Sequence, residues 1–252
     1  MARVAREKSQ SRIYHVMLRG INRQAIFEDD ADREKFLETL KSFKVISRYK
    51  IYAYCLMENH VHLLIEETEE PIGQSIKRIC GSYVYWYNRN HDRIGHLFQD
   101  RFKSEIIEDD SYFLTVLRYI HQNPLKAKLV QEIGKYKWSS YYDYFKNDGI
   151  IDSDWALKIF SEDSTQALIR FKRYMKEFNE DRCLEYEERK RLLDSDVREY
   201  LMQLGISSIS AIQNLQKDQR DEIIREIKSI DGVSIRQLSR VTGISKSIIE
   251  RA

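Results

Sequence analysis

The stretch from Glu58 to Glu66 constrains this chain more than any other. It reads Glu-Asn-His-Val-His-Leu-Leu-Ile-Glu, and its aliphatic residues are typical of a β-strand. Successive strand side chains point to opposite faces, so His60, His62 and Leu64 share one face. Two imidazoles side by side on a rigid strand can chelate one divalent metal ion. The alternative is a half-exposed strand on which two histidines merely lie close together.

The composition bounds the class of protein. The chain has 252 residues, of which 42% are hydrophobic and 33% are charged, and its net charge is +2. This length suits one large domain or two, and contacts with nucleic acid would have to come from local basic patches. No run approaches the roughly 18 apolar residues of a membrane span. Cys55, Cys80 and Cys183 are too far apart for a C-x-x-C site, and their odd number argues against a disulfide framework. We therefore expect a cytoplasmic protein without membrane contact.

Periodic apolar residues predict the order β-α-β-β-α-β, followed by one added helix. The expected strands are 12–19, 49–57, 60–66 and 101–108, and the expected helices are 30–48, 71–90 and 110–122. This order is the split βαβ, ferredoxin-like pattern of the α+β class, with a four-stranded antiparallel sheet and helices on one face. The other face would stay open for a site that contains the histidines.

We place a domain boundary after residue 150. Residues 151–252 have an almost entirely helical pattern, so we expect an all-α C-terminal region. Within 221–252, short helices at 221–230, 234–241 and 245–251 surround glycine turns, which is the pattern of a helix-turn-helix that can enter a major groove. A plain helical hairpin is the alternative.

The added helix carries the second half of the predicted site. Four residues advance a helix by about 400°, so Tyr119 and Asn123 lie one above the other on one face. Core packing is the alternative for a single tyrosine here. Beside the two histidines, however, the amide oxygen of Asn123 can be a third neutral metal ligand, which places Tyr119 next to the metal. His121 points to another face and is a poorer ligand.

These residue types suit attack on a phosphodiester. A tyrosine hydroxyl has a pKa of about 10 and needs activation. A metal ion with three neutral ligands keeps its full charge and can polarise a phosphate oxygen. Attack by Tyr119 would form a phosphotyrosine and free a 3′-hydroxyl, and the covalent link would allow rejoining without ATP.

Several short sequence motifs follow one another along the chain. They are Tyr14-His15-Val16, Arg19-Gly20, Asn22-Arg23, Phe27, Met57-Glu58-Asn59-His60-Val61-His62, Phe98-Gln99-Asp100-Arg101-Phe102, Tyr119-Ile120-His121-Gln122-Asn123-Pro124 and Trp138-Ser139-Ser140. Together they resemble the HUH single-tyrosine transposases, specifically the REP-associated kind in the IS200-like transposase family. The resemblance covers about residues 10–145 and leaves 150–252 outside it.

The resemblance implies a ferredoxin-like catalytic domain that uses Mg²⁺ or Mn²⁺ on single-stranded DNA with hairpin ends, through a 5′-phosphotyrosine. It implies that His60, His62 and Asn123 are metal ligands and that Tyr119 is the nucleophile. Many relatives in the wider group have Gln where Asn123 stands, so the shorter amide must bring its helix closer.

For DNA contacts we expect Arg19, Asn22 and Arg23 in the first loop, and Arg101 and Lys103 beside the fourth strand. Ordinary surface charge is the alternative for each. The expected partners are single-stranded or hairpin DNA, with duplex DNA on the C-terminal helices. The chain can act as a monomer or as a homodimer that exchanges its tyrosine helix.

Three other functions use the same residues. A replication or mobilisation initiator would share the nicking chemistry. A transcription regulator on this fold would bind hairpins and duplex DNA without cleavage. A metal-dependent phosphodiesterase would use water, so its activity would survive loss of the Tyr119 hydroxyl.

Overall fold

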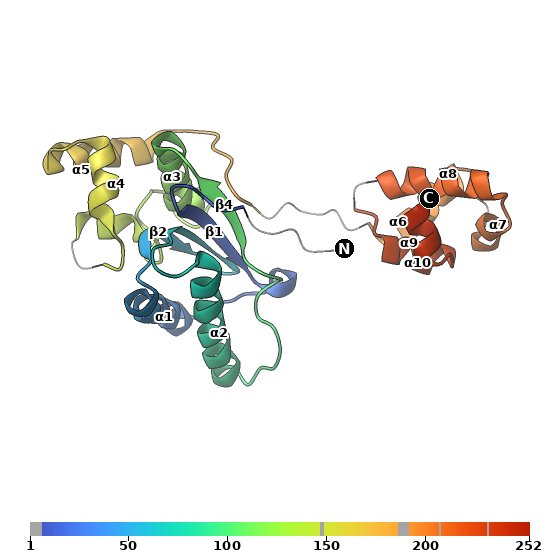
Figure 1. Cartoon of the computed structure of the whole chain (residues 1–252), viewed down its shortest axis with the longest axis horizontal. Coiled ribbons are helices and arrows are strands. Elements are labelled where there is room, and N and C mark those ends of the chain that lie inside the picture. The colour runs from blue at the N-terminus through green and yellow to red at the C-terminus, as the bar shows by residue number, and fades with distance from the viewer. Residues whose placement is uncertain (1–6, 147–148, 186–191, 207, 231) are drawn as a thin grey trace. The chain divides into compact units, whose positions relative to one another are not determined.

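The computed structural model describes residues 7–146, 149–185, 192–206, 208–230 and 232–252. The chain divides into two compact units, Met1–Glu185 and Tyr186–Ala252 (Figure 1). The predicted boundary after residue 150 is therefore too early. Phe171 and Met175, which follow that boundary, are fully buried in a core shared with the sheet residue Leu64. Their burial ties the first C-terminal helices to the N-terminal unit.

The first unit is built on a four-stranded antiparallel sheet, as the sequence predicted. The strands are β1 (Ile13–Arg19), β2 (Lys50–Leu56), β3 (His60–Glu66) and β4 (Lys103–Ile107). Their order in the sheet is β2-β3-β1-β4, so the histidine strand β3 is central. Met17 pairs with His62, and Arg19 pairs with His60. The β2–β3 hairpin forms as predicted.

Two long helices cover one face of the sheet. They are α1 (Asp30–Ser47) and α2 (Ile72–Asn90), and Figure 1 shows both below the strands. Phe36, Leu40 and Tyr83 from these helices pack against Val61 and Leu63 of β3 in one buried cluster. The Asp29 side chain accepts a hydrogen bond from the Asp32 amide and caps α1, as its sequence position predicted.

The opposite face is covered and not open, contrary to expectation. The helix α3 (Asp110–Lys126) packs on β2 and β3, and it is followed by η2 (Ser140–Phe145), α4 (Ser153–Phe160) and α5 (Ser164–Lys176). Because Leu64, Tyr119 and Phe171 belong to one buried cluster, the histidine face lies beneath α3. These helices bury their apolar side chains by packing against the second face of the sheet.

The tyrosine helix also runs further than the sequence suggested. It was expected to end at residue 122, because Pro124 cannot donate to the preceding turn. In the structure Pro124 lies inside α3, and the Ala127 amide donates to the Asn123 carbonyl at 2.9 Å. Ile120, His121 and Pro124 are buried on several sides of the helix, which offsets the lost hydrogen bond. Asn123 thus keeps regular helical spacing to Tyr119.

The second unit is a separate helical domain. Its helices are α6 (Asp194–Gln203), α7 (Ile209–Gln213), α8 (Lys217–Ser229), α9 (Ile235–Thr242) and α10 (Lys246–Arg251). The last three match the helices predicted at 221–230, 234–241 and 245–251. Gly243, with φ +70°, makes the turn between α9 and α10. Leu201, Ile224, Leu238 and Ile249 share its core.

All three cysteines are free thiols. Within the part of the chain that the structure describes, no helix combines the length and the apolar character that crossing a membrane requires.

Candidate active site

The two histidines of β3 lie side by side on the α3 face of the sheet. Their ring centroids are 5.1 Å apart and the rings are nearly perpendicular. His62 is fully buried, whereas His60, at the first position of the strand, is half-buried. The alternation of side chains along β3 therefore places both rings toward the same helix, as the sequence predicted.

Each of these rings is held by a contact at its Nδ1 atom. His60 Nδ1 lies 2.7 Å from Asn59 Oδ1, and His62 Nδ1 lies 2.9 Å from His15 Nε2. One nitrogen of each imidazole is thus occupied, so the Nε2 atoms are left to bind something else. A second hydrogen-bonding partner of this kind is what commonly orients a metal-binding histidine.

Asn123 reaches the same place from α3. Its Nδ2 atom lies 3.5 Å from His62 Nε2. A half turn of the amide group about its Cβ–Cγ bond would present the oxygen there. The predicted convergence of His60, His62 and Asn123 is therefore a feature of the folded chain, and it joins residues that are 61 positions apart.

The surroundings keep both imidazoles neutral at pH 7. Burial, and then the nearby Arg19 guanidinium, lower the pKa of His60 to about 4. Burial lowers the pKa of His62 well below 6.5, and the neighbouring rings of His15 and His60 act in the same direction. A neutral imidazole keeps the lone pair that a metal ion requires.

The donor set fits a divalent metal ion. Among the described residues, no group of three or more His, Cys, Asp and Glu side chains could hold one. The candidate site falls outside that definition because its third donor is an amide. Two imidazole nitrogens and an amide oxygen suit Mn²⁺, and Mg²⁺ accepts the amide oxygen readily.

Tyr119 lies against this group. Its ring meets those of His62 and His15 edge-on, with centroids 5.6 and 5.9 Å apart. The residue is only 2% exposed, and its hydroxyl donates a hydrogen bond of 2.6 Å to Glu185 Oε1. Burial and then the Glu185 carboxylate raise the pKa of Tyr119 far above 10. The phenol is therefore neutral, and its hydroxyl is already hydrogen-bonded to a carboxylate.

A short segment of chain holds that carboxylate over the site. Arg118 donates hydrogen bonds of 2.9 and 3.1 Å to Asp181, and Lys126 donates one of 3.1 Å to Asn179. The Leu184 amide donates to Glu105 Oε2 at 3.2 Å. Hydrogen bonds thus hold residues 177–185 against α3. The last residue of this segment, Glu185, contacts Tyr119.

Sequence reasoning missed three residues of this site. His15 and Glu105 stand in line behind His62, with His15 Nδ1 3.8 Å from Glu105 Oε2. Alternation within β1 could have placed His15 on the histidine face, because it stands two residues from Met17, the partner of His62. No local sequence pattern identifies Glu185, which is 66 positions from Tyr119 in the sequence.

His121 points away from the metal donors, as predicted. Its Nε2 atom lies 2.9 Å from Ser140 Oγ, and its ring packs edge-on against Tyr141, Tyr144 and Phe171. This histidine is part of the core of the first unit.

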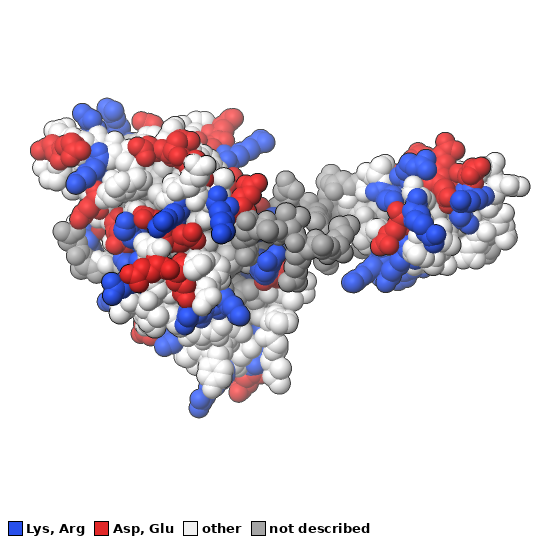
Figure 2. All heavy atoms as spheres, viewed as in Figure 1, with Lys and Arg blue, Asp and Glu red and all other residues white. Residues whose placement is uncertain are grey.

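The five predicted DNA-binding residues lie on β1, on β4 and in the segments next to these strands. Arg19 is opposite His60 in the sheet, and the Lys103 ammonium lies 3.4 Å from the Glu185 carbonyl. Asn22 and Arg23 form the 3-10 turn η1 (Ile21–Arg23) directly after β1, both with positive φ. Arg101 is exposed just before β4. Figure 2 shows basic and acidic side chains interspersed over the visible face of the first unit.

Comparisons with known proteins find similar sequences and a similar fold. Residues 8–123 match the family model described as "Transposase IS200 like". A Haemophilus influenzae protein assigned as a REP-associated tyrosine transposase is 26% identical over 119 residues, which are 43% of this chain and 67% of that protein. The solved structure of a REP-associated tyrosine transposase bound to a REP hairpin covers 73% of this chain and 99% of its own, with a TM-score of 0.51 and 14% identity. The structural likeness establishes the fold.

Proposed function

We propose, on the premise that residues 8–123 belong to the IS200-like transposase family, that this chain is a transposase of the REP-associated kind. It would cleave and rejoin single-stranded or hairpin DNA through Tyr119. The observation that carries the proposal is the convergence of Tyr119 and Asn123 on His60 and His62. The hairpin bound by the structural neighbour supports a hairpin substrate for this chain.

The proposed reaction exchanges one phosphodiester for another. The Tyr119 oxygen attacks the phosphorus, the bond from phosphorus to the 3′-oxygen breaks, and the phenol proton is transferred, in net terms, to that leaving oxygen. The products are a 5′-phosphotyrosine and a free 3′-hydroxyl. Attack of a 3′-hydroxyl on the phosphotyrosine reverses these steps and restores Tyr119, so cleavage and joining need no external energy source.

His60, His62 and Asn123 would hold the Mg²⁺ or Mn²⁺ ion that this family is expected to use. When bound, such an ion supplies a Lewis acid for a non-bridging phosphate oxygen. Asn59 and His15 keep the two imidazoles oriented for this role. Tyr119 can attack only after its hydroxyl leaves Glu185, so DNA entry must displace the end of segment 177–185.

Basic residues around the site suit the DNA backbone. Arg19 is beside His60, and Lys103 lies on β4 next to Glu185. Asn22, Arg23 and Arg101 extend the proposed contact surface along the neighbouring loops. Guanidinium, ammonium and amide groups of this kind bind phosphate without reading sequence.

The C-terminal unit is proposed to bind duplex DNA. The helices α9 and α10 surround the Gly243 turn, and Lys246 and Arg251 lie on α10. This arrangement supports a helix-turn-helix whose last helix would enter a major groove. The whole chain would then combine strand cleavage with a separate hold on duplex DNA.

One assay separates the proposed activity from its alternatives. The purified chain is incubated with hairpin DNA and Mn²⁺, with label at the 5′ end in one sample and at the 3′ end in another. We expect a denaturation-resistant adduct on the fragment that carries the 5′-phosphate, and its absence in Tyr119→Phe. Binding without any adduct would instead support the regulator, and cleavage by Tyr119→Phe would support the water-using phosphodiesterase.

A further inference from the structure

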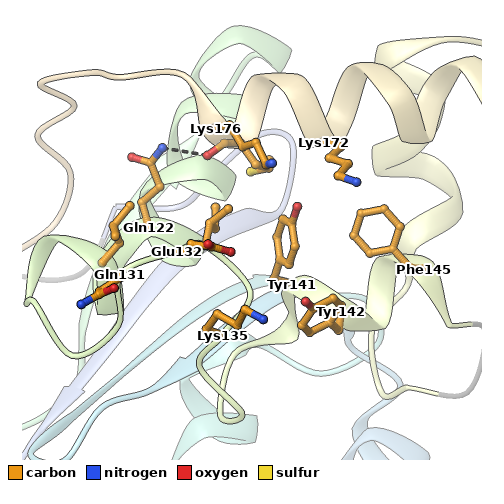
Figure 3. A pocket seen from close by; sticks show the side chains of 12 residues that line it. Gln122, Gln131, Glu132, Lys135, Tyr141, Tyr142, Phe145, Lys172 and Lys176 are labelled. Atoms are coloured by element: carbon orange, nitrogen blue, oxygen red, sulfur yellow. Dashed lines mark hydrogen bonds between the residues drawn. The ribbon is translucent and has the colours of Figure 1, made fainter.

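A cavity lies beside α3, between the loop that follows this helix, η2 and α5 (Figure 3). Its volume is about 490 Å³, within the range of small-ligand sites. Gln122 lines it from α3, one residue before Asn123. The cavity therefore adjoins the tyrosine helix without being part of the site described above.

Aromatic rings form one wall of this cavity. Tyr141 is buried and packs parallel to Phe171 with centroids 5.7 Å apart, whereas Tyr142 and Phe145 are 47% and 39% exposed. Gly134, whose φ is +88°, packs closely on the Tyr141 ring, because a Cβ atom at this position would fall 2.7 Å from the ring. Tyr142 and Phe145 therefore present partly exposed rings beside a buried aromatic base.

Three ammonium groups surround the rings. Lys172 and Lys176 stand one turn apart on α5, and Lys135 approaches from the loop on the opposite side (Figure 3). Figure 3 shows Lys172 reaching toward the space between Tyr141 and Phe145. Within the described residues, none of the three forms an ion pair with a carboxylate. Glu132 is the carboxylate that lines the cavity, so the formal charge is three minus one, or +2.

Exposed rings together with unpaired cations match one ligand class. A nucleotide offers a flat base that stacks on aromatic side chains and a phosphate that an ammonium group can bind. A base in a duplex is already stacked, so the ligand must be unpaired. We propose that this cavity binds a nucleotide of the single-stranded DNA that flanks the hairpin. The inference rests on the proposed function, because the cavity is lined by Gln122 of α3, the helix that carries Tyr119 and Asn123.

The first test compares two DNA ligands on the full-length chain. One is a blunt hairpin, and the other is the same hairpin with single-stranded tails. We expect the tails to tighten binding to the wild-type chain. In Tyr142→Ala/Phe145→Ala, binding of the tailed hairpin should weaken by about tenfold, because stacking contributes about 1–3 kcal/mol per base, whereas binding of the blunt hairpin should not change. Circular dichroism of the variant is the control that its fold is intact.

The lysines are tested through the salt dependence of binding to the tailed hairpin. For Lys172→Gln/Lys176→Gln, the slope of log affinity against log salt should fall by about 1.4, which is about 0.7 for each lost contact with a single strand. The control Lys41→Gln/Lys158→Gln removes the same charge from exposed positions on α1 and α4, and it should keep the wild-type slope.

A photoreactive 5-iodouracil at successive tail positions locates the strand. The expected result is a crosslink to the peptide that contains Tyr142 and Phe145. The inference would be overturned if the ring and lysine variants affected blunt and tailed hairpins equally, or if the tail crosslinked only to other parts of the chain. A chain that binds no hairpin at all would instead refute the proposed function.

Discussion

His15 Nε2 lies 2.9 Å from His62 Nδ1, and both rings are buried. Behind them, Glu105 Oε2 lies 3.8 Å from the other nitrogen of His15. If His62 uses Nε2 for a metal ion, its Nδ1 carries the proton and donates to His15, whose own Nδ1 proton then faces Glu105. In that tautomer His62 presents its Nε2 lone pair on the side of Asn123.

We therefore predict that His15→Ala weakens Mn²⁺ binding by about tenfold to a hundredfold. The variant removes the partner that orients His62 without removing a proposed ligand. Isothermal titration calorimetry on the DNA-free chain gives the affinity. His15→Gln, which can still accept the hydrogen bond, should restore part of it. An affinity that is equal in wild type and His15→Ala would mean that His15 only fills space.

Glu185 should restrain the reaction. Its carboxylate occupies the Tyr119 hydroxyl at 2.6 Å and places a negative charge where a phosphate must approach. Glu185→Gln should therefore increase the initial rate of adduct formation, measured with a labelled hairpin. Glu180→Gln, an exposed neighbour in the same segment, serves as the control and should leave the rate unchanged. A slower reaction in Glu185→Gln would instead identify Glu185 as an acceptor of the phenol proton.

The first unit should need its helices beyond residue 150. Phe171 is fully buried and packs parallel to Tyr144 with centroids 4.3 Å apart. Phe171→Ala should lower the free energy of unfolding by about 3–5 kcal/mol, measured by urea denaturation. Ile169→Ala removes a residue that is 56% exposed on the same helix and should have little effect. Equal stability of both variants would show that α5 is not part of this core.

One histidine outside the site should make stability depend on pH. The Asp32 carboxylate, 2.8 Å from His91 Nε2, raises the pKa of His91 above 6.5. The folded chain then holds this proton more tightly than the unfolded chain. The stabilisation is fully present below about pH 6.5 and is lost as pH rises through the higher, folded pKa.

The difference in Tm between wild type and His91→Gln should therefore be larger at about pH 5.5 than at about pH 9. Glutamine can keep a hydrogen bond to Asp32 but carries no charge. His96→Gln, at an exposed position nearby, controls for the loss of a histidine. A difference that grows with rising pH would have the wrong sign for this ion pair.

Short-range periodicity accounts for the parts of the site that the sequence predicted. A repeat of two placed His60 and His62 on one face, and a spacing of four placed Tyr119 and Asn123 on another. The contacts of His15 and Glu185 depend on how β1 and segment 177–185 pack, and no local pattern specifies such pairs. The covered sheet face was missed for a related reason, because the helices that cover it follow residue 109 and their docking surface is not a sequence motif.

Mass spectrometry of the covalent adduct tests the central claim most directly. Full-length chain is trapped on hairpin DNA with Mn²⁺, digested with nuclease and protease, and the modified peptide is sequenced. The account predicts a nucleotide joined through its 5′-phosphate to Tyr119, and no adduct in His60→Ala/His62→Ala. A nucleotide joined to a different residue, or an adduct that forms equally well without both imidazoles, would contradict it.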